Sequence, residues 1–258
     1  MRVGILGGTG AMGGLFGSYM ARSGHDVVLV DVNRDAVARA NSPGVRIDDK
    51  DGTTTTRMLA TLDPSSVAVV DAVIVFVKCY HTENAVRAAL PMIGDNTVVL
   101  SLQNGWGNGA LIADIVGPER AAVGLTYHSA TALGPGHIKH TGTGKTLLGR
   151  IDGSVSERVG QIAEALNDAG IAAEATTDVL REVWSKLALN VCTLPTAAVL
   201  RFTSDALIAD AHVRELMREL LAEAIAVANA QGIPLDFDER WGTITDVLTR
   251  AVGGKPSM

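Results

Sequence analysis

The first half of the chain alternates short apolar runs with amphipathic stretches. The apolar runs predict strands at Val3–Leu6, Asp26–Val30, Ala72–Val77, Thr97–Leu102 and Ala121–Thr126. Helical spacing of apolar residues predicts helices at 15–20, Arg34–Ala40 and Thr82–Leu90. A continuous apolar run such as Ala72–Val77 is typical of a strand that is buried on both faces. The alternation therefore predicts a mostly parallel sheet with helices on both faces.

The pattern changes in the second half of the chain. Residues Gly134–Gly149, rich in Gly, Thr and His, are interpreted as sheet-edge loops with a short strand at Thr146–Leu148. Helical periodicity then predicts helices at Val155–Ala169, Asp178–Leu194, Asp205–Gln231 and Leu235–Val252. The second helix is expected to stop at Pro195, because proline interrupts a helix. We therefore predict a Rossmann-type, doubly wound α/β domain at 1–175 and an all-helical domain at 176–258.

The first predicted strand leads into Gly8-Thr9-Gly10-Ala11-Met12-Gly13, a G-x-G-x-x-G pattern that precedes a predicted helix. In such a loop Gly8 permits a tight turn, Gly10 lets the backbone approach a pyrophosphate, and Gly13 lets the helix pack closely. The helix N-terminus offers N–H groups to phosphate oxygens. These six residues are therefore predicted to bind a dinucleotide, and a purely structural glycine turn is the alternative.

Asp31 ends the second predicted strand, about 20 residues beyond the glycines, where a carboxylate accepts hydrogen bonds from the adenosine ribose. A carboxylate there repels a 2′-phosphate and favours NAD. Arg34, three residues later, is a candidate partner for the 2′-phosphate of NADP. The alternative is that Asp31 only caps the next turn.

Lys78 and Asn104 each follow a predicted buried strand, so both should face the crevice at the carboxyl ends of the strands. Lys78 is a candidate contact for a cofactor phosphate or the substrate. The amide of Asn104 can orient a nicotinamide ribose or a substrate oxygen. A solvated loop lysine and a tight Asn104-Gly105 turn are the alternatives.

Lys186 and Asn190 lie at i and i+4 in the long helix after the sheet domain and share a face. Their neighbours along the helix are apolar. A partly buried lysine has a lowered pKa and can donate a proton to a carbonyl oxygen. The alternative for Lys186 is a solvated helix lysine.

Composition excludes some classes of partner. The net charge of −6 and the lack of a dense Lys/Arg stripe argue against nucleic acid, although a small anionic substrate needs only local cations. The two cysteines are expected to be reduced and buried. No signal peptide or membrane-length apolar run is apparent, and the histidines lack metal-ligand spacing. We therefore predict a cytoplasmic protein that binds neither a membrane nor a metal.

These features together resemble the ketopantoate reductase (2-dehydropantoate 2-reductase) family over essentially the whole chain. The matching segments are the glycine loop, Val77-Lys78, Gln103-Asn104-Gly105, 135–142, Trp184-x-Lys186-Leu-Ala-x-Asn190 and Lys255-Pro256-Ser257-Met258. The resemblance implies reduction of 2-dehydropantoate to pantoate in pantothenate synthesis, usually with NADPH. It further implies that Lys186 is the general acid and that Asn190 and Ser257 bind substrate. Asn104, from its position after a buried strand, is predicted to bind cofactor and substrate.

The chain departs from similar proteins in three places. Leu194 stands where they carry a second asparagine, and Asp31 stands where they carry a basic residue. They also continue beyond the position of Met258 with a segment that holds a substrate-binding glutamate. Because Asp31 replaces that basic residue, NADH is a possible cofactor beside NADPH. A dehydrogenase of another keto or hydroxy acid and a non-catalytic nucleotide-binding protein stay as alternatives. The Ala/Leu-rich helical half could form a homodimer face or an internal core.

Overall fold

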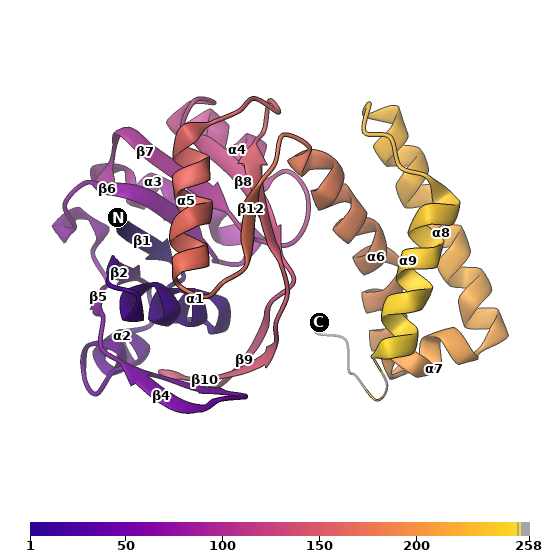
Figure 1. Ribbon diagram of the computed structural model, residues 1–258, viewed down its shortest axis with the longest axis horizontal. Coiled ribbons are helices and arrows are strands. Elements are labelled where there is room, and N and C mark those ends of the chain that lie inside the picture. The colour runs from indigo at the N-terminus through magenta and orange to yellow at the C-terminus, as the bar shows by residue number, and fades with distance from the viewer. Residues whose placement is uncertain (252, 254–258) are drawn as a thin grey trace. The chain divides into compact units, whose positions relative to one another are not determined.

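The computed structural model describes residues 1–251 and 253. The chain divides into two units, Met1–Val179 and Leu180–Met258 (Figure 1). Strands and helices alternate in the first unit, whereas the described part of the second unit is helical. The predicted combination of an α/β domain and a helical domain is confirmed.

The main sheet of the first unit has eight strands in the order β12-β11-β8-β7-β6-β1-β2-β5. Their bounds are β1 Arg2–Leu6, β2 Asp26–Val30, β5 Leu59–Thr61, β6 Val70–Val75, β7 Ile93–Ser101, β8 Ala121–Thr126, β11 Thr146–Arg150 and β12 Ala173–Ala175. Neighbours run parallel except β8 and β11, which are antiparallel. The predicted strand Ala72–Val77 thus ends two residues early, so Phe76 and Val77 belong to the loop that carries Lys78.

Helices cover both faces of this sheet. Their bounds are α1 Ala11–Arg22, α2 Arg34–Asn41, α3 Thr82–Ala88, α4 Asn108–Val116 and α5 Glu157–Asp168. Alternation along β6 explains the two layers: Ala72 and Ile74 join an apolar cluster with α1 and α5, whereas Val73 and Val75 join a cluster with α3 and α4. Figure 1 shows α1 and α5 on the same side of the sheet.

A second, four-stranded sheet was not predicted. It has the order β4-β3-β10-β9, with bounds β3 Val45–Asp49, β4 Gly52–Thr56, β9 Ser129–Gly134 and β10 His137–Gly142. It packs on the side of α1 that the main sheet leaves open (Figure 1). A Cβ atom on Gly14 would lie 2.4 Å from Cδ1 of Ile138, so the helix approaches this sheet very closely. The interpretation as loops was therefore wrong for His137–Gly142, which forms β10, whereas the short strand predicted at Thr146–Leu148 is confirmed as part of β11.

Hydrogen-bonded histidines tie this second sheet to α1. On β10, His140 makes two hydrogen bonds through its ring. Its Nδ1 lies 3.0 Å from Tyr19 Oη, and its Nε2 lies 3.1 Å from His128 Nδ1. Burial, with a smaller contribution from His140, lowers the pKa of His128. His137 Nε2 lies 2.6 Å from Asp48 Oδ2. The sequence does not reveal these hydrogen bonds, because they join residues from different segments of the chain.

The second unit contains α7 (Ser204–Ala209), α8 (Ala211–Ala230), α9 (Phe237–Arg250) and nearly all of α6 (Val179–Leu200). Helix α6 continues through Pro195, contrary to the prediction that it stops there. Hydroxyl groups bond back onto the helix on both sides of the proline: Thr193 Oγ1 donates to Leu189 O at 2.7 Å, and Thr196 Oγ1 donates to Cys192 O at 2.9 Å. Packing of α6 outweighs the local cost of the proline.

Helix α6 is also long and apolar enough, by length and composition, to cross a membrane, with 44% of its most apolar window buried. The expectation that no apolar run approaches that length was therefore wrong. Buried core helices of water-soluble proteins pass the same test, and α6 contributes to an apolar core within its unit.

The predicted helix Asp205–Gln231 is in fact two helices, α7 and α8, which meet at Asp210. The carboxylate of Asp210 accepts hydrogen bonds from the backbone N–H groups of His212 at 2.9 Å and Val213 at 3.0 Å. Asp210 is therefore the N-cap of α8, a role that aspartate fills well.

Candidate functional site

The glycine loop joins β1 to α1 as predicted, but the tight turn falls on a different residue. Gly7, with φ of +73°, has a left-handed conformation, whereas Gly8, which was predicted to permit the tight turn, does not. Gly8 is restricted by packing, because its Cβ would lie 2.7 Å from Ile5 O and 2.8 Å from Leu29 Cβ. Backbone bonds from Gly7 N and Gly8 N to Val30 O, at 2.9 and 3.2 Å, fix the loop on β2.

Gly13 lets α1 start directly against this loop. A Cβ at Gly13 would lie 2.4 Å from Gly7 O, and Gly10 is the N-cap of the helix. The first turn of a helix has N–H groups without intrahelical partners, and these groups bind phosphate oxygens. The glycines at positions 7, 8 and 13 thus let α1 begin directly against the end of β1, as the predicted pyrophosphate site requires.

We expect the substitution Gly13→Ala to weaken nucleotide binding at least tenfold, because the added methyl group forces the loop away from α1. The measurement is the Kd of NADH and NADPH by quenching of protein fluorescence. Gly160→Ala in α5 is the matched control, since nothing lies within 4 Å of the Cβ it would add. Nucleotide affinity equal in the two variants would show that the close approach at Gly13 is not required.

The carboxylate of Asp31 is held in place by three backbone N–H groups. Its Oδ2 accepts from Thr9 N at 3.0 Å, and its Oδ1 accepts from Val32 N at 2.8 Å and Asn33 N at 3.2 Å. One bond therefore joins the end of β2 to the glycine loop, and two bonds orient the carboxylate. Arg34 is exposed in the first turn of α2, and no ion pair joins it to Asp31 in the described structure.

A pocket of about 340 Å³ lies beside Asp31, at the carboxyl ends of β1 and β2. Its walls are mainly apolar and include Val32, Leu62 and Pro64, with His81 on another side. Apolar walls with a carboxylate at one edge suit a flat heterocycle that is linked to a diol. The sequence interpretation missed Leu62, Pro64 and His81; strand β5, which precedes Leu62, has only three residues and gave little signal.

The loops that carry Lys78 and Asn104 are braced by Gln103. Its Nε2 donates to Val77 O at 2.7 Å and to Thr82 Oγ1 at 2.9 Å. Lys78 and Asn104 are both exposed, and both follow strands of the main sheet at its carboxyl edge. Gln103 therefore joins the two loops. Its own role was not predicted, although it belongs to one of the motifs.

Residue Cys79 lies next to Lys78 and is exposed, so the expectation that both cysteines are buried was wrong for it. It starts a short 3₁₀ turn, Cys79–His81, in the loop after β6. The other cysteine, Cys192, is buried in α6, and burial raises the pKa of its thiol to about 12.

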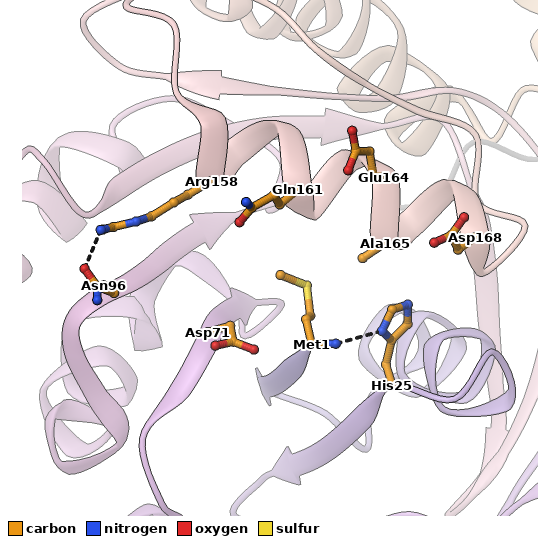
Figure 2. Close-up of a pocket in the computed structure, with 9 residues that line it drawn as sticks. All are labelled: Met1, His25, Asp71, Asn96, Arg158, Gln161, Glu164, Ala165 and Asp168. Carbon is orange, nitrogen blue, oxygen red and sulfur yellow. Dashed lines mark hydrogen bonds between the residues drawn. The ribbon is translucent and has the colours of Figure 1, made fainter.

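A larger pocket, of about 500 Å³, lies at the edge of the main sheet formed by the amino-terminal ends of its strands (Figure 2). It surrounds Met1, whose amino group lies 3.2 Å from His25 Nδ1, and Arg158 of α5 donates to Asn96 at its far side. This edge holds the amino ends of β1 and β6, whereas ligands of open α/β sheets bind at the carboxyl ends. The pocket beside Asp31 is thus the better candidate site despite its smaller volume.

The second unit carries the predicted catalytic pair on α6. Lys186 and Asn190 are one turn apart, share a face, and are both partly buried. Burial lowers the pKa of Lys186 from 10.5 to about 8. An ammonium group with this pKa is charged at neutral pH and gives up its proton more readily than an exposed lysine does.

Ser257, predicted to bind substrate, lies outside the described residues. Among the described residues, no group of three or more His, Cys, Asp and Glu side chains is placed to hold a metal ion.

Two family models together match most of the chain. The family model for "Ketopantoate reductase PanE/ApbA" matches residues 3–153, and the model for its C-terminal domain matches residues 178–258. The 2-dehydropantoate 2-reductase of Halobacterium salinarum is 35% identical over 234 residues, which are 90% of this chain and 77% of the relative.

Solved structures show the same fold. A 2-dehydropantoate 2-reductase from Geobacter metallireducens has a TM-score of 0.88 at 30% identity and covers 100% of this chain and 85% of its own. D-mandelate dehydrogenase, in a ternary structure with NADH and anilino(oxo)acetate, has a TM-score of 0.91 at 24% identity, with coverage of 100% and 84%. At that identity the second likeness shows the fold alone. The chain belongs to the ketopantoate reductase family and is an NAD(P)-dependent oxidoreductase.

Proposed function

We propose that this protein reduces 2-dehydropantoate, or a closely related 2-keto acid, to the corresponding 2-hydroxy acid. The observation that carries the proposal is Lys186, a partly buried lysine of lowered pKa on the same helix face as Asn190. A protein that only senses a nucleotide has no need of such a proton donor. With 2-dehydropantoate the product is pantoate, and the reaction would serve pantothenate synthesis.

Different residues would bind the cofactor, donate the proton and orient the substrate. The glycine loop and Asp31 would hold the nicotinamide cofactor, and the bound cofactor would supply the hydride that adds to C2 of the keto acid. Negative charge then develops on the carbonyl oxygen, and the ammonium group of Lys186 stabilises that charge and donates its proton. Asn190 and Asn104 offer amide groups that orient the substrate. The carbonyl carbon gains the hydride and the oxygen gains the proton, which yields the hydroxyl group.

The choice between NADH and NADPH depends on Asp31. The family resemblance implies NADPH, but the geometry favours NADH. Three N–H groups hold the Asp31 carboxylate at the pocket, and turning it aside to admit a 2′-phosphate would break these hydrogen bonds. A like-charge contact of this kind costs several kcal/mol in such sites. We therefore propose NADH as the preferred cofactor, with NADPH used less efficiently.

The direct test is to mix the purified protein with NADH or NADPH and 2-dehydropantoate and to follow the loss of nicotinamide absorbance. Turnover with formation of pantoate supports the proposal. Nucleotide binding without turnover of any 2-keto acid would favour the non-catalytic alternative. A homodimer and a cytoplasmic location stay predictions from the sequence.

The pH dependence of the reaction should report Lys186. The general acid must carry its proton, so kcat/KM for the keto acid should fall as the pH rises through about 8, where Lys186 loses that proton. An ordinary lysine would keep its proton until about pH 10.4. The measurement is kcat/KM between pH 6 and about pH 10 at saturating cofactor. A constant value across that range would exclude Lys186 as the titrating acid.

A further inference from the structure

The helix face that carries Lys186 and Asn190 continues one turn further to Leu194. The three residues lie at i, i+4 and i+8 of α6, and all three are partly buried. Each step of four residues advances about 6 Å along a helix axis. The face therefore presents a cation, an amide and an aliphatic side chain in that order.

This face is turned away from the helical core, the apolar cluster of the second unit that includes Trp184, Ala188 and Cys192. Those three core residues form their own i, i+4, i+8 row on α6. Residues two positions apart on a helix are separated by about 200°, so the row that starts at Lys186 lies on the opposite side. Leu194, unlike Leu187 and Leu189, is not one of the partly buried side chains that pack on the helical core in the described structure.

Packing on the helical core of the second unit therefore does not explain why residue 194 is apolar. A substrate whose keto oxygen meets Lys186, and whose side chain extends along this face past Asn190, would bring the end of that side chain against Leu194. A leucine offers neither a donor nor an acceptor. A substrate hydroxyl placed against it loses its hydrogen bonds to water without replacement, which is unfavourable.

We propose that Leu194 makes this site select 2-keto acids with a wholly apolar side chain over 2-dehydropantoate, whose side chain ends in a hydroxyl. This inference rests on the proposed function and specifies its substrate class. Wild-type protein should therefore be more efficient with 3,3-dimethyl-2-oxobutanoate, which differs from 2-dehydropantoate only in lacking that hydroxyl. Apolar pockets discriminate against an added hydroxyl by up to about a hundredfold, and we expect about tenfold or more.

The test compares kcat/KM for these two acids in wild-type protein and three variants. Leu194→Asn should shift the ratio towards 2-dehydropantoate by about tenfold or more, because the amide can bond the hydroxyl. Leu194→Met keeps an apolar side chain and should keep the wild-type ratio. Val199→Asn, at an exposed position near the end of α6, is the matched control and should also leave the ratio unchanged. Thermal unfolding of each variant checks that it is folded.

Each outcome separates this inference from the proposed function. A wild-type preference for 2-dehydropantoate, or an unchanged ratio in folded Leu194→Asn, would overturn the role of Leu194 and leave 2-keto acid reduction intact. Reduction of neither acid with either cofactor would overturn both. A preference for the hydroxyl-free acid that Leu194→Asn reverses, while Leu194→Met and Val199→Asn retain it, would establish the inference.

Discussion

Replacing Lys186 with alanine should lower kcat at least a hundredfold while the affinity for NADH stays nearly unchanged. The loss removes the proton donor and the charge that stabilises the developing alkoxide, and a hundredfold corresponds to about 2.7 kcal/mol. Nucleotide affinity should persist because the glycine loop and Asp31 belong to the first unit, whereas Lys186 belongs to the second. Steady-state kinetics and fluorescence titration with NADH measure the two quantities.

Asn190→Ala is the natural companion, since it removes an orienting amide and should mainly raise KM for the keto acid. A folded Lys186→Ala protein that keeps kcat within about threefold, less than about 1 kcal/mol, would mean that another group or water is the acid. Lys78 is the next candidate in that case. Loss of NADH binding in Lys186→Ala would instead indicate a structural role for the lysine.

The second large effect concerns the cofactor. We expect wild-type protein to have a kcat/KM at least tenfold higher with NADH than with NADPH, because the fixed Asp31 carboxylate repels a 2′-phosphate. Asp31→Asn removes the charge at constant size and should reduce that preference about tenfold. Asp35→Asn removes an exposed carboxylate from the first turn of α2 and is the control that should leave the preference unchanged.

Equal efficiency with the two cofactors, or a preference for NADPH, would show that Arg34 or another cation offsets Asp31. A preference for NADH that survives in Asp31→Asn would place the selecting group elsewhere in the pocket.

Much of the first unit could be predicted because its central strands are continuous apolar runs. The second sheet could not, because its strands expose mostly polar residues. Strand β4 is Gly-Thr-Thr-Thr-Thr, and only isolated side chains such as Ile47 and Ile138 pack inward against α1. A period of two with at most two buried apolar residues per strand is too weak a signal when the covering element is a helix from a distant segment.

The errors in the helical unit have local causes. Pro195 predicts the end of a helix, but the tertiary packing of α6 overrides this local preference. Asp210 lies within an apparently continuous helical period, and its capping role depends on a backbone turn that the period does not encode. The position of Lys186 on α6 was predictable from spacing, whereas its lowered pKa required the burial that only the structure provides.

The most direct test of the account is to follow the transferred hydrogen itself. The protein should be incubated with NADH that carries deuterium at C4 of the nicotinamide, together with 2-dehydropantoate or 3,3-dimethyl-2-oxobutanoate, and the acid should be analysed by mass spectrometry. We expect a 2-hydroxy acid that has gained one deuterium at C2 from the labelled face of the cofactor. If both faces are tested and no deuterated 2-hydroxy acid forms from either keto acid, the assignment as a 2-keto acid reductase is contradicted.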